Sequence, residues 1–158
     1  MATINIRNIK DLELVLGKAI EDAMTNEVLD ETKKIIKDKV ETVVYNAGTP
    51  KEYTRRNFSS GSLGDLDMIE HRYKDDVLEV TNEADFHHGF AQDPDTWGYG
   101  AVDRGKSLTY NIEHGYGSKD KWYNKPRRFM GETKKELRDG KFRKALVKGL
   151  RRLKIKAK

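Results

Sequence analysis

The fold is decided by residues 8–46, which read NIKDLELVLGKAIEDAMTNEVLDETKKIIKDKVETVVYN. Asn8 is a residue type that caps helices, and Asp11 and Glu13 place negative charge in the first turn, where the helix dipole favours it. Apolar residues then recur at the spacing of one helix face: Leu12, Val15, Leu16, Ala19, Ile20 and Ala23. This pattern predicts an amphipathic helix that ends near Met24.

A second apolar stripe continues the pattern on nearly the opposite side. Its members are Val28, Leu29, Ile35, Ile36, Val40 and Val43. Because the phase breaks near Thr25-Asn26, and either residue can cap a helix, we expect a joint there. The second helix should run to about Asn46, before the Ala-Gly-Thr-Pro sequence of residues 47–50 stops it.

The rest of the chain predicts a hairpin and further helices. Residues 53–64 are polar and rich in Ser and Gly, which predicts a loop or a hairpin. Residues 66–73 and 77–81 suggest two strands, joined by a turn at Lys74-Asp75-Asp76. Residues 108–115 fit a helical turn or a strand. Two helical stretches should follow, at 129–139 and 141–153, with a bend at Gly140 and an apolar stripe under a basic face.

A length of 158 residues supports a single domain. Within it we expect an N-terminal helix in 1–25, a core of helix and sheet with loops in 26–130, and a basic C-terminal helix and tail in 131–158. The chain contains no cysteine, which removes disulfides and zinc-thiolate sites. It shows neither a signal peptide nor a long apolar run, so we expect a soluble protein with no membrane partner.

The net charge of +5 conceals an asymmetry. From Lys119 to Lys158 the chain holds 17 Lys and Arg against 4 Asp and Glu, whereas the preceding residues hold 14 against 22. An acidic body with a basic end indicates two interaction surfaces of opposite sign. The basic end could meet DNA, an acidic neighbouring protein or another copy's acidic body, and a solvated basic helix is the structural alternative.

Motifs that would carry chemistry are weak. Four histidines, His71, His87, His88 and His114, lack the spacing of a metal site. Asp65 and Asp67 near Arg55-Arg56 could suggest a nuclease, but a turn rich in Asp explains them equally well. We therefore expect no catalytic residue, no cofactor and no metal.

One run in the C-terminal third resembles a known family. It reads Tyr110-Asn-Ile-Glu113-His-Gly115-Tyr-Gly117, then Lys125-Pro126-Arg127-Arg128-Phe129-Met130-Gly-Glu-Thr133. Upstream it is extended by Val44-Tyr45, Pro50-x-x-Tyr53-x-Arg55-Arg56 and Gly61-x-Leu63. In order and spacing these motifs are similar to those of the tail-completion proteins of long-tailed phages, also called head-tail joining or neck proteins. The resemblance covers roughly Val28 to Leu153.

The resemblance implies an α+β fold in which N-terminal helices and a C-terminal amphipathic helix pack on a small curved antiparallel sheet, with a long mobile loop. It also implies a homo-oligomeric ring around the DNA channel of the virion, at the head-tail junction. We therefore expect a structural protein, made in the host cytoplasm, and not an enzyme. The implied partners are other copies of the chain, a portal-side connector or head-completion protein, a tail tube or tail terminator protein, and passing DNA bound non-specifically.

Seven residues are the expected contacts of such a subunit. Under the resemblance Tyr110, Glu113, Arg127, Arg128 and Phe129, together with Pro126, would position the C-terminal element. Arg55 and Arg56, with the Ser-Gly loop, would engage a neighbour or face the channel. Ordinary roles in folding explain each residue individually just as well. The alternative function is a small basic nucleic-acid-binding protein whose C-terminal helix tracks phosphates.

Overall fold

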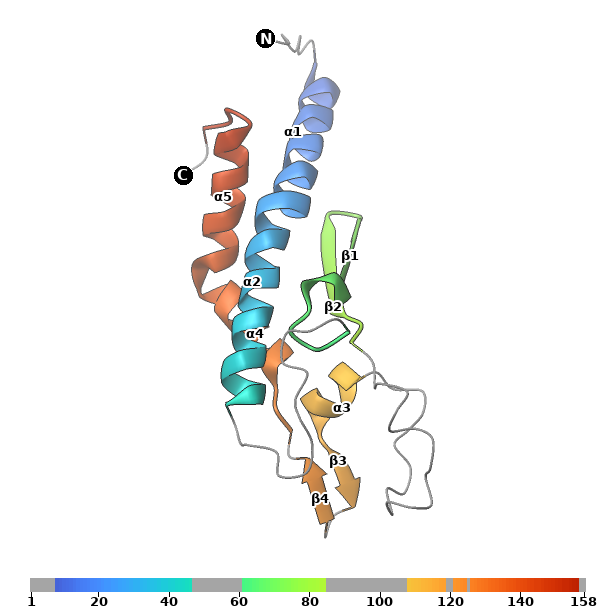
Figure 1. The fold of residues 1–158 in the computed structure, drawn as a ribbon. Helices are drawn as coiled ribbons and strands as arrows, with labels where there is room; N and C mark the ends of the chain where they lie inside the picture. The colour runs from blue at the N-terminus through green and yellow to red at the C-terminus, as the bar shows by residue number, and fades with distance from the viewer. Residues whose placement is uncertain (1–7, 47–60, 85–107, 119–120, 125, 157–158) are drawn as a thin grey trace.

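A computed structural model describes residues 8–46, 61–84, 108–118, 121–124 and 126–156 (Figure 1). Its dominant feature is one long helix. Two α-helical segments and two π-helical segments follow one another in it without a break: α1 (Ile9–Ala23), η1 (Met24–Val28), α2 (Leu29–Lys39) and η2 (Val40–Tyr45). The expected cap is confirmed, because Oδ1 of Asn8 accepts a hydrogen bond from the backbone N–H of Asp11 at 2.9 Å.

The expected joint at Thr25-Asn26 is wrong, since the helix continues through it. Thr25 Oγ1 donates to the carbonyl of Glu21 at 2.8 Å, and Asn26 Nδ2 donates to the carbonyl of Asp22 at 2.8 Å. Neither side chain therefore caps a new helix. The π turn of η1 contains an extra residue, so it changes the phase of the apolar stripe while the backbone stays helical.

The predicted hairpin is confirmed. After a short 3-10 turn, η3 (Leu66–Met68), the antiparallel strands β1 (Ile69–Lys74) and β2 (Val77–Asn82) pair with Tyr73 opposite Leu78. Asp75 and Asp76 form the turn, with φ of 50° and 60°. Two successive residues with positive φ match the turn type whose twist suits a two-residue hairpin.

The C-terminal half begins with α3 (Leu108–His114) and a second hairpin, made of β3 (Tyr116–Ser118) and β4 (Lys121–Asn124). The sequence did not predict these strands. Three helical segments complete the chain: α4 (Phe129–Glu136), η5 (Leu137–Lys141) and α5 (Phe142–Arg152). The expected bend is confirmed at Gly140, whose φ of 107° interrupts the helical geometry.

The long helix lies between the β1–β2 hairpin and α5 (Figure 1). One cluster joins the three, with Met24 and Val28 of the helix, Ala145 and Leu146 of α5, and Tyr73 and Leu78 of the hairpin. A second cluster, the lower cluster, lies nearer the C-terminal end of the long helix. It contains Ile36, Val40, Val44, Leu63, Ile69, Ala84, Ile112 and Phe129. The α+β class is confirmed, whereas the loop expected at 53–64 falls largely outside the described residues.

Candidate interaction surface

Five of the seven expected contact residues lie in the described part of the chain. Arg55 and Arg56 fall outside it. The other five gather where α3, α4 and the end of the long helix meet, and they divide into side chains that hold the chain together and side chains that face solvent.

Glu113 joins α3 to α4. Its Oε2 accepts from the backbone N–H of Met130 and its Oε1 from that of Gly131, both at 3.0 Å. These N–H groups belong to the first turn of α4, where they have no partner within the helix. The carboxylate therefore satisfies two donors and places a negative charge at the positive end of the helix dipole.

Arg127 and Phe129 stabilise the same place, the junction of α3, α4 and the C-terminal end of the long helix. Arg127 Nη1 donates to the carbonyl of Val44 at 3.1 Å, and the backbone N–H of Arg127 donates to the carbonyl of Ile112 at 2.9 Å. Phe129 is fully buried in the lower cluster. Together these residues tie the end of the long helix, α3 and α4 into one unit.

Tyr110 and Arg128 present side chains to solvent. Tyr110 is 41% exposed and stacks on His114, with 4.2 Å between the ring centroids. Arg128 precedes α4 and is exposed. Of the five described candidates, these two are the ones that a partner can reach without rearrangement of the junction.

In the described residues, Asp65 has a structural role and the histidines do not gather into a metal site. Asp65 accepts hydrogen bonds from the backbone N–H groups of Gly61 at 2.7 Å and Asp67 at 3.0 Å, so its oxygens stabilise a turn. No group of three or more His, Cys, Asp or Glu that could hold a metal ion occurs there. Nor is any helix in this part of the chain long and apolar enough to cross a membrane.

Among the described residues, most of the exposed large apolar side chains lie on α1. Ala23 is its one buried residue, although the whole helix follows an amphipathic pattern. Its stripe consists of large side chains that remain exposed: Ile9 at 75%, Leu12 at 40%, Leu16 at 38% and Ile20 at 37%. Figure 1 shows the N-terminal turns of α1 extending past the tip of the β1–β2 hairpin. The sequence signals an apolar face here, but the chain does not bury it.

Acidic side chains of the long helix pair with basic side chains of the C-terminal segments within the subunit. Arg152 of α5 hydrogen-bonds Asp22 and Glu27, with Nε 2.5 Å from Glu27 Oε1. This hydrogen bond holds the pKa of the Glu27 carboxyl below its ordinary value. Lys141 reaches Glu31 at 3.4 Å. Some basic residues of the C-terminal end therefore pair with acidic residues of the same chain, a pairing that the sequence alone does not indicate.

Close helix contact accompanies these ion pairs. Gly149 of α5 is buried, and a Cβ there would stand 2.6 Å from the Cβ of Ala23. Ala145 and Gly149 lie one helical turn apart on the same face, so α5 meets the long helix through small residues. This spacing was readable in the sequence as a site of close approach.

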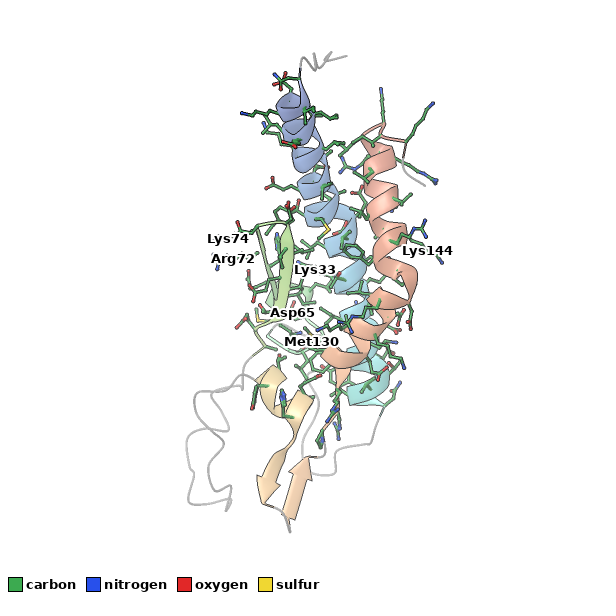
Figure 2. The ribbon with its side chains drawn as sticks, turned by 180° about the vertical axis from the view of Figure 1, so that it is seen from behind. Lys33, Asp65, Arg72, Lys74, Met130 and Lys144 are labelled. Atoms are coloured by element: carbon green, nitrogen blue, oxygen red, sulfur yellow. The ribbon has the colours of Figure 1, made fainter. Side chains whose placement is uncertain are left out.

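The outer face of α5 remains basic. Lys144 and Lys148 are exposed, and Lys144 points away from the long helix (Figure 2). Among the described residues no carboxylate pairs with Lys144. Phe142 on this helix is 38% exposed, and Val147 and Leu150 are half-buried. Of these three, Val147 lies on the same side as Lys144, whereas Phe142 lies one turn from Ala145 and Leu146, on the side that faces the long helix. Positive charge therefore dominates the outer face.

Comparison with known proteins places the chain in one family. A family model described as YomN matches residues 8–152, which is nearly the whole chain. No curated protein and no solved structure matches it significantly. The chain therefore belongs to the YomN family, whose name is phage-derived.

Proposed function

We propose that this chain is a structural protein of a bacteriophage virion, not an enzyme, and that copies of it form a ring around the DNA channel at the head-tail junction. Two observations agree with this role. The name of the family is phage-derived, and the motifs that resemble tail-completion proteins lie within the residues that the family model matches.

The observation that carries the proposal is the exposed apolar stripe of α1. A subunit that works alone gains nothing from an amphipathic helix whose apolar face stays in water. A subunit of an assembly buries such a face against a neighbour. The partners in this proposal are further copies of the chain, a portal-side connector or head-completion protein, and a tail tube or tail terminator protein, with DNA passing through the ring without specific contacts.

Deletion of the gene from a phage that carries it tests the proposal. We expect filled heads and free tails, visible separately by electron microscopy, because the piece that joins them is absent. Supplying the protein in trans should restore complete particles, and the protein should then be found at the junction by immunogold labelling. Complete, infectious particles made without the protein would contradict the proposal.

The basic outer face of α5 supports a second candidate, a small nucleic-acid-binding protein. Lys144 and Lys148 would contact phosphates and release counterions. This function requires duplex binding that weakens steeply between low and physiological salt and that is lost in the Lys144→Glu, Lys148→Glu variant. Under the virion proposal, the free subunit binds duplex DNA weakly at physiological salt.

A further inference from the structure

We propose that α5 is a hinged arm, closed on the long helix in this structure, that opens by rotation of the backbone at Asp139 and Gly140. In the open position the segment from α4 to α5 is one straight helix, and α5 no longer contacts the long helix. The movement lies within one subunit and does not depend on the head-tail role proposed above.

The hinge is confined to two residues between two helices. Asp139 has a ψ of 18° and Gly140 a φ of 107°, whereas α4 and α5 on either side are α-helical. Among the described residues, nothing stands within 4 Å of a Cβ added at Gly140, so packing does not require a glycine there. The positive φ does, because L side chains rarely adopt it. Glycine also adopts the ordinary helical φ, so this residue permits both a bent and a straight segment.

The bend decides whether α5 can contact the long helix. The residues that α4 buries are Phe129 and Thr133, and those that α5 buries are Ala145 and Gly149. In an unbroken helix the second pair would lie roughly 120–200° around the axis from the first, on nearly the opposite side. With the bend, α4 packs against α2 while α5 packs against α1 and η1 (Figure 1). Straightening the segment would therefore leave α4 in place and turn the contact face of α5 away.

The closed contact buries little apolar area of α5. Its two buried residues, Ala145 and Gly149, are small, and Leu146 packs on the same cluster while remaining partly exposed. Elements held by few buried apolar groups open at a low cost in free energy. Release of α5 is therefore easier than release of α4, which buries Phe129 completely.

Ion pairs provide the remaining attachment, and solvent reaches them. Arg152 pairs with Asp22 and Glu27, and its side chain is 47% exposed. Lys141, beside the hinge, pairs with Glu31 at 3.4 Å. Pairs between exposed groups are screened by salt and each contributes little to stability. A rise in ionic strength should therefore shift the arm from the closed position toward the open one.

Opening changes the surface that the subunit presents. It would uncover the sides of Met24 and Val28 that α5 covers, together with the face of α5 that carries Ala145. Because α5 would continue α4 as one helix, this apolar surface is gained without loss of secondary structure. The hinge therefore conceals an apolar surface in one position and exposes it in the other.

Distances between two spin labels distinguish the two positions. The natural chain contains no cysteine, and Lys18 of α1 and Lys148 of α5 are exposed, so Lys18→Cys with Lys148→Cys places one label on each helix. Pulsed electron paramagnetic resonance at low salt should give one short distance. At about 1 M salt, where charges are strongly screened, a second and longer distance should appear.

Substitution at the hinge supplies the decisive comparison. Gly140→Ala should raise the ratio of long to short distances about tenfold, because alanine disfavours the positive φ and favours a continuous helix. Gly140→Asn is the matched control, since asparagine adopts positive φ more readily than other side chains, and its distances should stay close to those of the natural chain. Circular dichroism of the same proteins should show that Gly140→Ala keeps its full helical signal.

Four results would overturn the inference. A single short distance in Gly140→Ala at both salt concentrations would show that the arm does not open. A longer distance with a loss of helical signal would show that α5 unfolds instead. Equal lengthening in Gly140→Asn and Gly140→Ala would show that the φ of residue 140 does not control the position. Distances in the natural chain that ignore salt would exclude the ion pairs as the attachment. None of these results affects the outcome of the gene deletion, so this inference and the head-tail role fail independently.

Discussion

Replacing Gly149 by Ala should destabilise the protein, although Gly to Ala in a helix ordinarily does the opposite. In an open helical position the change stabilises by about 1 kcal/mol, because Ala has the higher helix propensity. At Gly149, however, the added Cβ would lie 2.6 Å from Ala23 Cβ, 2.6 Å from Glu27 Oε2 and 2.9 Å from Ala23 Cα. Two of these atoms belong to a buried residue of the long helix and cannot swing away.

The magnitude follows from those contacts. Overpacking a tight site by one methyl group costs about 1–3 kcal/mol, and the backbone contact places Gly149→Ala in the upper part of that range. After the propensity gain of about 1 kcal/mol is offset, we expect a net loss of about 1–2 kcal/mol in the free energy of unfolding. The displacement of α5 should also lengthen the hydrogen bonds between Arg152 and Glu27.

Gly17→Ala is the matched control. Gly17 lies in α1, and nothing stands within 4 Å of the Cβ that would be added. We expect this variant to gain up to about 1 kcal/mol. Urea unfolding followed by circular dichroism measures both variants against the natural chain. If Gly149→Ala were stabilised as much as Gly17→Ala, the close approach of α5 to the long helix would be refuted.

Further variants test the junction and the ion pair. Glu113→Ala should lose about 2 kcal/mol of stability in thermal unfolding, because two N–H groups of α4 lose a charged acceptor. Arg127→Ala should lower the free energy of unfolding by about 1–3 kcal/mol, whereas Arg128→Ala, which removes an exposed side chain, should lower it by less than about 0.5 kcal/mol. Equal losses in the two variants would contradict the role of Arg127 in holding the long helix to α4. The hydrogen bond from Arg152 lowers the pKa of Glu27 from 4.5, so its stabilisation is present above pH 4.5 and is lost as the pH falls through the lowered folded-state pKa. The free energy of unfolding, measured against pH, should therefore fall less steeply toward acid pH in Arg152→Leu than in the natural chain. Identical slopes in the two proteins would argue against the Arg152–Glu27 pair.

Much of the helical structure was predictable because it depends on local signals. The cap at Asn8, the end of the long helix near Asn46 and the bend at Gly140 each follow from one residue type in one position. The phase change near Thr25 was located correctly but interpreted wrongly. A π turn and a break between helices leave the same mark on an apolar pattern, since both shift the stripe while conserving its period.

The second hairpin was missed for a different reason. Strands β3 and β4 are three and four residues long, too short for alternation to stand out beside the glycines at 115 and 117. Gly115, which separates α3 from β3, has a positive φ of 76°, a backbone conformation that glycine adopts readily.

The structural roles of the motif residues could not be predicted from the sequence. Glu113 and Arg127 belong to the resemblance, yet their partners are backbone groups at Met130, Gly131 and Val44. A side chain that bonds to backbone leaves no complementary residue type in the sequence to reveal it. Arg152, which joins α5 to the long helix, lay outside the motifs and resembled any other member of a basic run.

The apolar stripe of α1 illustrates a further limit of prediction from sequence periodicity. Periodicity states that a helix has an apolar face, but not which surface will cover it. The second stripe, from Val28 onward, is buried within the chain, whereas the first remains exposed at Leu12, Leu16 and Ile20. Both stripes carry the same signal, so the difference between them is the part that only the fold reveals. The same apolar period is therefore buried in one stretch of the long helix and left partly in solvent in another, and the periodicity alone does not distinguish the two.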